Sequence, residues 1–238
     1  MTIEIMISCF LYQHRMCWML SSILQQKGDI PDIVTSISYL PNNGNPTTEQ
    51  CIDFFKKEGL NIISVPVNQG EESNRAIARN IRAKNSKADW IIFADADMVY
   101  STNLFEELKK KLETEQWKNE KRVIGADRHS LEIQYCVDYF NNDTRAYPCV
   151  IPNVAEEVSK WPVWYVKGKR IAPGYFQLAS LQAIKEKGGI YSPINIDRWR
   201  MCKTDRVFRS HMGGKVGMDL PKQYHLNHDR SDDHDLQR

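Results

Sequence analysis

The chain has 238 residues, with 32 basic against 30 acidic side chains and a net charge of +2. This length suits one large α/β domain, or one domain with a subdomain. The balanced charge gives no electrostatic argument for a nucleic-acid partner, and we expect none. No apolar run approaches the roughly 20 residues of a membrane span, although a peripheral contact with a membrane stays open.

The start of the chain and the cysteines indicate a cytoplasmic protein. The segment Met1–Met6 lacks the basic flank of a secretory signal and is predicted to be a first strand. The six cysteines are scattered and form no Cys-x-x-Cys pair. This pattern favours free thiols in a reducing cytosol over disulfides or a zinc site.

Predicted strands alternate with predicted helices through residue 126. The strands are short apolar runs, and the helices repeat apolar residues at helical spacing, as in Met16, Leu20 and Ile23. This alternation predicts an α/β fold, with a mostly parallel central sheet flanked by helices. Strands are expected at residues 3–8, 33–39, 61–67, from 90 to the aspartates, and 122–126. Helices are expected from about residue 16 to 28, 51 to 59, 73 to 85, and from 103.

The rhythm breaks from residue 127 onward. Residues 127–228 are rich in aromatic residues and prolines and are predicted to form a smaller, irregular C-terminal subdomain rather than more of the same sheet. Its aromatic cluster, Trp161, Trp164 and Tyr165, suits either stacking on a sugar face or an ordinary core. The tail, residues 229–238, is polar apart from Leu236 and is predicted to be disordered.

The strand that begins at Trp90 runs directly into two carboxylates, Asp95 and Asp97. In open parallel sheets ligands lie beyond the carboxyl ends of the strands. If the chain stays extended, residues two apart point to the same side. Two anions in one small space repel each other, and a hard divalent cation that carries a phosphorylated ligand would satisfy both. The alternative is that Asp95 caps the helix that follows.

A stripe of arginines lies in the predicted helix that ends at residue 85. Arg75, Arg79 and Arg82 fall at i, i+4 and i+7, which places them on one face. Arginines aligned in this way suit a diphosphate or a sugar carboxylate. The alternative is a solvated basic face.

Two later stretches carry further candidates. Residues 203–209 are predicted to begin a short helix with Asp205 near its N-terminus, where a helix cap is the alternative role. His225 and His228 follow an extended segment, and residues three apart on a strand face opposite ways. At most one of them is therefore expected to share a metal with the aspartates, and the alternative for each is an ordinary surface histidine.

Several short motifs follow one another along the chain in a recognisable order. They are Ile7–Gln13, Ser21–Gln26, Asn68-Gln69-Gly70, Ala78-Arg79-Asn80, Ile91–Asp97, Gly174–Leu178, Gly188-Gly189-Ile190, Thr204-Asp205-Arg206, and a late histidine, His225 or His228. This order and spacing resemble the nucleotide-sugar-dependent glycosyltransferases of the GT-A fold, and most of all the inverting family 2. The resemblance covers roughly residues 3–228.

The resemblance implies roles for the two halves and for four residues. Residues 1–126 would bind the nucleotide sugar, and residues 127–228 would bind the acceptor and supply the base. Asp97, with a histidine, would hold Mn²⁺ or Mg²⁺ on the donor phosphates, and Asp95 would contact the ribose or the metal. Arg79 would stabilise the departing nucleoside diphosphate. Asp205 stands at the family's position for the catalytic base.

The implied reaction transfers a sugar from a nucleoside-diphosphate sugar, expected to be a UDP-sugar, to a hydroxyl of a saccharide or glycoconjugate, with inversion. Tyr12 and Gln13 match the family's turn after the first strand and are expected at the donor. The family's acidic run after the second strand, which contacts the nucleobase, is missing. Asn43 is the amide expected to contact the nucleobase instead. Thr204 replaces the family's usual Glu. Asp197 and Asp219 are the reserve candidates for the base.

Two other classes stay open. A sugar-nucleotide pyrophosphorylase has a similar sheet, but it would carry a glycine-rich loop after the first strand, and residues 8–15 contain no glycine. A non-catalytic nucleotide-sugar or carbohydrate-binding protein of the same fold would keep the Asp-x-Asp pair without turning over a substrate.

Overall fold

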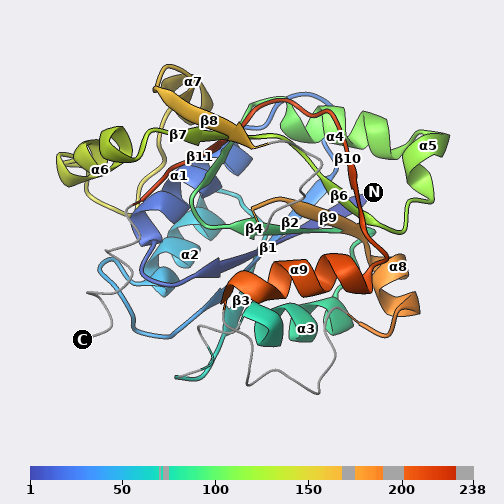
Figure 1. The fold of residues 1–238 in the computed structure, drawn as a ribbon. Coiled ribbons are helices and arrows are strands. Elements are labelled where there is room, and N and C mark those ends of the chain that lie inside the picture. The colour runs from blue at the N-terminus through green and yellow to red at the C-terminus, as the bar shows by residue number, and fades with distance from the viewer. Residues whose placement is uncertain (70, 72–74, 168–174, 190–200, 229–238) are drawn as a thin grey trace.

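Two sheets and the helices packed around them make up the fold (Figure 1). The structure is a computed structural model that describes the chain except for residues 70, 72–74, 168–174, 190–200 and 229–238. The tail and Asp197 therefore lie outside the described residues, and the predictions made for them stay predictions.

The large sheet is built from the apolar runs that the sequence predicts to be strands. Its order is β10-β6-β9-β4-β1-β2-β3, and neighbouring strands are parallel except for β9, which is antiparallel to both β4 and β6. The predicted α/β fold with a mostly parallel central sheet is thus confirmed. The strands are β1 (Thr2–Cys9), β2 (Asp32–Tyr39), β3 (Ile62–Pro66), β4 (Trp90–Asp95), β6 (Val123–Gly125), β9 (Gln177–Ser180) and β10 (Lys215–Gly217).

Helices cover both faces of this sheet, which explains why β1 is apolar at almost every position (Figure 1). Ile3, Ile5 and Ile7 point into a core shared with α1, α2 and α4, whereas Met6 points into a second core shared with α3, α8 and α9. The helices are α1 (Gln13–Leu24), α2 (Thr48–Lys57), α3 (Arg75–Asn85), α4 (Leu104–Leu112), α5 (Glu115–Lys118), α8 (Leu181–Glu186) and α9 (Met201–His211).

A four-stranded sheet lies beyond α1, in the order β5-β11-β7-β8. Strand β11 is antiparallel to β5 and parallel to β7, and β8 forms an edge. Trp18 of α1 and Trp161 belong to its core, with ring centroids 5.4 Å apart. The elements are β5 (Met98–Tyr100), β7 (Arg128–Leu131), β8 (Val163–Lys167), β11 (Gln223–His225), α6 (Ile133–Asn141) and α7 (Val154–Ser159).

The prediction that residues 127–228 add nothing to the large sheet is wrong for two strands. β9 lies between β4 and β6, and β10 lies at the edge beside β6. Both are very short, four and three residues. Runs of that length are too short to show an alternating pattern in the sequence, and only pairing with the longer strands identifies them.

The aromatic cluster at residues 161–165 divides between two environments. Trp161 is buried in the core of the small sheet, so the core interpretation is confirmed for it. Trp164 is 63% exposed and Tyr165 is 38% exposed on the edge strand β8. These two side chains are therefore available for contact with another molecule.

Two general expectations can be compared with the structure. Cys9, Cys17, Cys51, Cys136 and Cys149 are free thiols, as the cysteine pattern predicts. Across the described ranges, none of the helices has both the length and the apolar character needed to cross a membrane.

Candidate functional site

The chain passes from one sheet to the other between Asp95 and Asp97. Asp95 is the last residue of β4 in the large sheet, and β5 of the small sheet begins at Met98. The chain turns at Ala96 and Asp97, so the condition under which the two carboxylates would point to one side is not met. Each aspartate has its own set of partners.

Asp97 meets both histidines. Its Oδ2 lies 3.0 Å from Nε2 of His225 and 3.5 Å from Nε2 of His228, and one ligand atom from each of the three residues falls within 4.8 Å of the others. The pairing of β11 with β5 sets His225 opposite Met98, and the Leu226 amide donates to the Asp97 carbonyl at 2.9 Å. These backbone contacts hold Asp97 and His225 together, and the side chain of His228 completes the triad, Asp97, His225 and His228.

The prediction that only one histidine can join the aspartate is therefore wrong. It assumed that the strand continues through residue 228, whereas β11 ends at His225. Beyond that point the chain is no longer extended, and the alternation of side chains between two faces no longer applies. The surface-histidine alternative fails as well, because only 12% and 18% of the two side chains are exposed.

The triad fits a divalent cation. Burial disfavours the charged form of Asp97, but His225, His228 and Arg15 outweigh that effect and hold the pKa of the carboxyl well below its usual value. Its Oδ1 is buried without a hydrogen-bond partner. Tyr12 places its hydroxyl 3.2 Å from Nδ1 of His228, which leaves Nε2 directed at Asp97. An outer partner on the far ring nitrogen is typical of histidines that ligate metals.

Asp95 is paired with an arginine instead of joining the triad. Nη1 of Arg75 donates to its Oδ1 at 2.6 Å. Arg79 is 3% exposed and donates to Asp205 at 2.9 Å, and Arg82 binds buried Glu4 through two nitrogens. The alternative of a solvated basic face is wrong, since each arginine has a carboxylate partner.

Asp205 belongs to the interior of a helix. It is the fifth residue of α9, which begins four residues earlier, so the prediction that it lies near a helix N-terminus is wrong and the capping alternative does not apply. Arg79 lies over the ring of Phe93, 4.5 Å from its centroid, and reaches Asp205 from α3. Gln177 of β9 donates to the carbonyl of Asp205 at 3.3 Å. Arg79 thus holds the carboxylate of Asp205, and Gln177 holds the backbone of the same residue.

Gln13 shapes a loop. It is buried, and its Nε2 donates to the Asn43 carbonyl at 2.9 Å and to Thr48 Oγ1 at 3.1 Å. Gly44 has a φ of +87°, and a Cβ there would lie 2.3 Å from the same Nε2, so glycine is required for this close approach. Gln13 therefore positions the loop that carries Asn43.

A narrow cleft opens at the carboxyl ends of β1 and β2, beside Asp95. Ser8 and Cys9 line it from β1, Ser38 and Tyr39 line it from β2, and Arg75 lines it from α3. This is the edge of a parallel sheet at which nucleotides bind.

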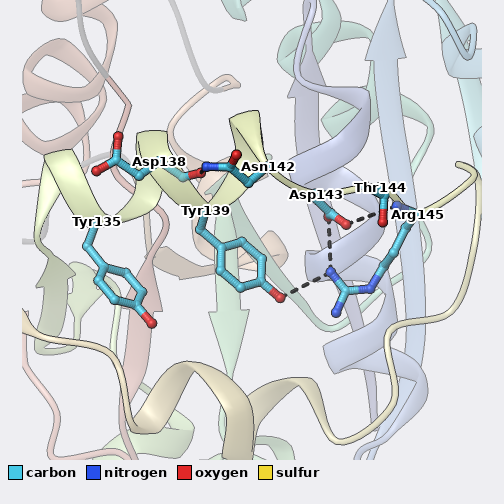
Figure 2. A pocket seen from close by; sticks show the side chains of 7 residues that line it. All are labelled: Tyr135, Asp138, Tyr139, Asn142, Asp143, Thr144 and Arg145. Carbon is cyan, nitrogen blue, oxygen red and sulfur yellow. Dashed lines mark hydrogen bonds and ion pairs between the residues drawn. The ribbon is translucent and has the colours of Figure 1, made fainter.

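A second, larger cavity of about 700 Å³ lies along α6 (Figure 2). Tyr135 and Tyr139 project into the same space from this helix, and Arg145 approaches from the following segment. Arg145 donates to the Tyr139 hydroxyl at 3.1 Å and forms an ion pair with Asp143 at 3.0 Å. The remaining lining residues are Asp138, Asn142 and Thr144.

Comparison with known families bears on this arrangement. Residues 5–117, which run from within β1 to within α5 and include the Asp-x-Asp turn, match the family described as Glycosyl transferase family 2. The expected family resemblance is thereby confirmed for the half of the chain that carries Asp95 and Asp97.

Solved structures share the fold over nearly the whole chain. TarS of S. aureus in complex with UDP-GlcNAc is 13% identical, with a TM-score of 0.62 over 97% of this chain and 59% of that chain. The mannosyltransferase PcManGT of Pyrobaculum calidifontis, in complex with GDP-Man and Mn²⁺, is 13% identical, with a TM-score of 0.55 over 94% and 56%. The chain spans 36% of the longer TarS structure. No curated protein matches the sequence.

The sequence missed Arg15 and the role of Arg75. Arg75 was recognised only as part of a stripe, because its partner Asp95 was assigned to the metal. The sequence did contain an indication of this contact, because an arginine stripe and an Asp-x-Asp pair in one parallel-sheet fold can form ion pairs with each other. Arg15 gives no such signal, because the triad reaches the start of α1 only through the pairing of β5 with β11 and the contact of His228 with Tyr12.

The triad leads to a prediction that separates it from the alternating-strand interpretation. His225→Ala and His228→Ala should each weaken Mn²⁺ binding at least about tenfold, since even outer-shell changes cost 10–100-fold. Calorimetric titration of Mn²⁺ would measure both. His129→Ala, a change to a histidine of the same sheet outside the triad, is the control. A large loss for one variant and none for the other would show that only one histidine is a ligand.

Proposed function

We propose that this chain is a metal-dependent glycosyltransferase that moves a sugar from a nucleoside-diphosphate sugar to an acceptor hydroxyl. The observation that carries the proposal is the triad of Asp97, His225 and His228, which stands at the carboxyl end of β4 within reach of the family 2 region. Asp205, held by Arg79, supplies a second carboxylate on the other face of the sheet end.

The metal we propose is Mn²⁺ in preference to Mg²⁺. Two imidazoles and one carboxylate make a mixed nitrogen and oxygen set, whereas Mg²⁺ strongly prefers oxygen ligands. Asp97, His225 and His228 would hold the ion, with further positions left for the donor phosphates. When bound, it would supply positive charge that stabilises a departing nucleoside diphosphate.

Asp205 is the base in this proposal. Its carboxylate would accept the proton of the acceptor hydroxyl as that oxygen attacks the anomeric carbon. Arg79 is buried and bound to Asp205, so we assign it to positioning this carboxylate instead of contacting the diphosphate. A single displacement of this kind inverts the anomeric centre. Arg75, which is paired with Asp95, lines the narrow cleft at the ends of β1 and β2, and we place the nucleoside at this edge of the sheet.

The donor class rests on the relatives. TarS structures contain UDP or UDP-GlcNAc, and PcManGT contains GDP-Man with Mn²⁺. We propose a UDP-sugar as the donor. Tyr12 would lie near its diphosphate, beside the triad, and Asn43, on the loop that Gln13 holds, would lie near its nucleobase. The free thiols support a cytoplasmic location, which fractionation of the source cells would check.

For the acceptor we propose a saccharide in the cavity along α6. Tyr135 and Tyr139 offer ring faces for stacking on a sugar, and Asp138, Asn142 and Thr144 offer groups that bond hydroxyls. Arg145 is neutralised by Asp143, so the cavity suits an uncharged saccharide unit.

Two other readings of the site have weaker support. Two histidines and one carboxylate also suit non-haem iron oxygenases, but the position of the triad at a GT-A sheet end and the family 2 match favour sugar transfer. A non-catalytic binding protein of the same fold would keep the triad and the cleft, and turnover of a donor is the measurement that separates it from an enzyme.

The donor prediction needs no knowledge of the acceptor. A panel of UDP, GDP and their sugars should raise the melting temperature only when Mn²⁺ is present, because a ligand that binds the folded state stabilises it by mass action. At least one sugar nucleotide should also be slowly hydrolysed. Stabilisation without any hydrolysis or transfer would favour the non-catalytic alternative, and stabilisation that does not depend on Mn²⁺ would remove the metal from donor binding.

Asp205→Asn tests the base. We expect turnover to fall by roughly the 10²–10⁴-fold typical of general acid–base catalysis, with UDP affinity unchanged. Loss of the charge opposite buried Arg79 should also cost about 1–3 kcal/mol of stability, so rates must be measured well below the melting temperature. Asp219→Asn is the comparison, and a larger loss there than at Asp205 would move the base assignment.

Tyr135→Ala tests the acceptor cavity. Removal of this half-exposed ring should weaken binding to the best saccharide on a glycan array about fivefold to tenfold, given the usual strength of stacking contacts. Trp164→Ala, which removes an exposed aromatic ring from β8, is the matched control. If Trp164→Ala weakens binding and Tyr135→Ala does not, the acceptor lies on β8.

A further inference from the structure

Arg15 stands beside the triad on the side that faces α6. Its guanidinium carbon is 4.7 Å from the ring centroid of Phe140 and 5.7 Å from that of Tyr12. The Tyr12 hydroxyl is 3.2 Å from His228, so a single aromatic residue separates Arg15 from a proposed metal ligand. None of the roles assigned so far uses this side chain.

Arg15 differs from the other arginines at the site. Arg75, Arg79 and Arg82 each have a carboxylate partner, whereas Arg15 has no ion pair with any described residue. Its Nε is buried without a hydrogen-bond partner. Stacking on two rings holds the guanidinium in place, while no carboxylate among the described residues forms an ion pair with it. A buried donor without a partner costs free energy, and a ligand that accepts from it would remove that cost.

The position of Arg15 within its helix also disfavours a purely structural role. It lies in the first turn of α1, which contains no acidic residue. A cation near a helix N-terminus opposes the helix dipole by about 0.3–1 kcal/mol. The unpaired Nε of Arg15 and the helix dipole both favour binding of an anion beside this side chain.

The charge balance of the described residues indicates which anion fits. Asp95 is offset by Arg75, and Asp205 is offset by Arg79. A divalent cation bound to the single negative charge of Asp97 has a net charge of one positive unit, and Arg15 adds a second positive unit. The diphosphate of a sugar nucleotide carries two negative charges, which would neutralise both.

We propose that Arg15 binds the diphosphate of the donor and offsets the charge that this group gains in the reaction. In the reaction the bond between the anomeric carbon and the diphosphate oxygen breaks, and its electron pair stays on that oxygen. The acceptor oxygen forms the new bond and passes its proton to Asp205. The nucleoside diphosphate leaves with one more negative charge than the donor brought, and the fixed charge of Arg15 stabilises it there.

The inference rests on the proposed function, and Arg15→Gln tests it through binding. The variant should bind Mn²⁺ alone as the wild type does. Its affinity for UDP in the presence of Mn²⁺ should fall about tenfold or more, as for a lost hydrogen bond to a charged group. The loss should be smaller for UMP and absent for uridine. Calorimetric titration gives all four values, and GDP, GMP and guanosine replace the uridine series if the wild type prefers guanine.

Arg122→Gln is the matched control, because Arg122 is a half-exposed arginine paired with Glu120 outside the site. Arg15→Met keeps the stem packed on Phe140 and repeats the test if Arg15→Gln melts early. Unchanged UDP affinity in either folded variant overturns the role of Arg15 and leaves the proposed function standing. An equal loss for UDP and uridine also overturns it, since that pattern belongs to packing of the nucleoside. A wild type that binds neither UDP nor GDP with Mn²⁺ overturns the proposed function and this inference together.

Discussion

The pairing of β5 with β11 is the interaction on which the site depends. It joins two segments more than 120 residues apart and brings His225 opposite Met98, one residue beyond Asp97. The chain then leaves the strand, and His228 turns back to the same carboxylate. Without this pairing, the turn after β4 would present two aspartates and no imidazole. The small sheet therefore completes a site that the large sheet begins.

The charges around this site are separated into independent groups. Arginines of α3 neutralise Asp95 and Asp205, which are therefore oriented by hydrogen-bonded ion pairs on the side of α3 and α9. Asp97 is supported on the opposite side by the histidines, Tyr12 and the charge of Arg15. In the function we propose, this separation would let Asp205 serve as a proton acceptor while Asp97 serves as a metal ligand.

The two sheets also divide the substrates in the function we propose. The nucleoside cleft belongs to β1, β2 and α3 of the large sheet, and the acceptor cavity belongs to α6, which packs on the small sheet. Helix α1 connects the two regions, because Gln13 holds the loop after β2 while Trp18 enters the core of the small sheet. A change in α1 would therefore alter the binding of both the donor and the acceptor.

Five strands of the large sheet, among them the strand that ends at Asp95, and the resemblance to a glycosyltransferase family could be predicted from the sequence. Those features depend on long apolar runs and on local motifs, which are visible without any contact between distant residues. Which side chains contact one another depends on the packing of distant segments. Asp95 is paired with Arg75, and both histidines contact Asp97, while Arg15 lies beside the triad. The ends of the strands, the turn at Ala96 and the packing of the helices set the directions of these side chains. Strands as short as β9 and β11 show no pattern from which the neighbouring strands could be predicted. Their places in the two sheets depend on pairing with segments far away along the chain.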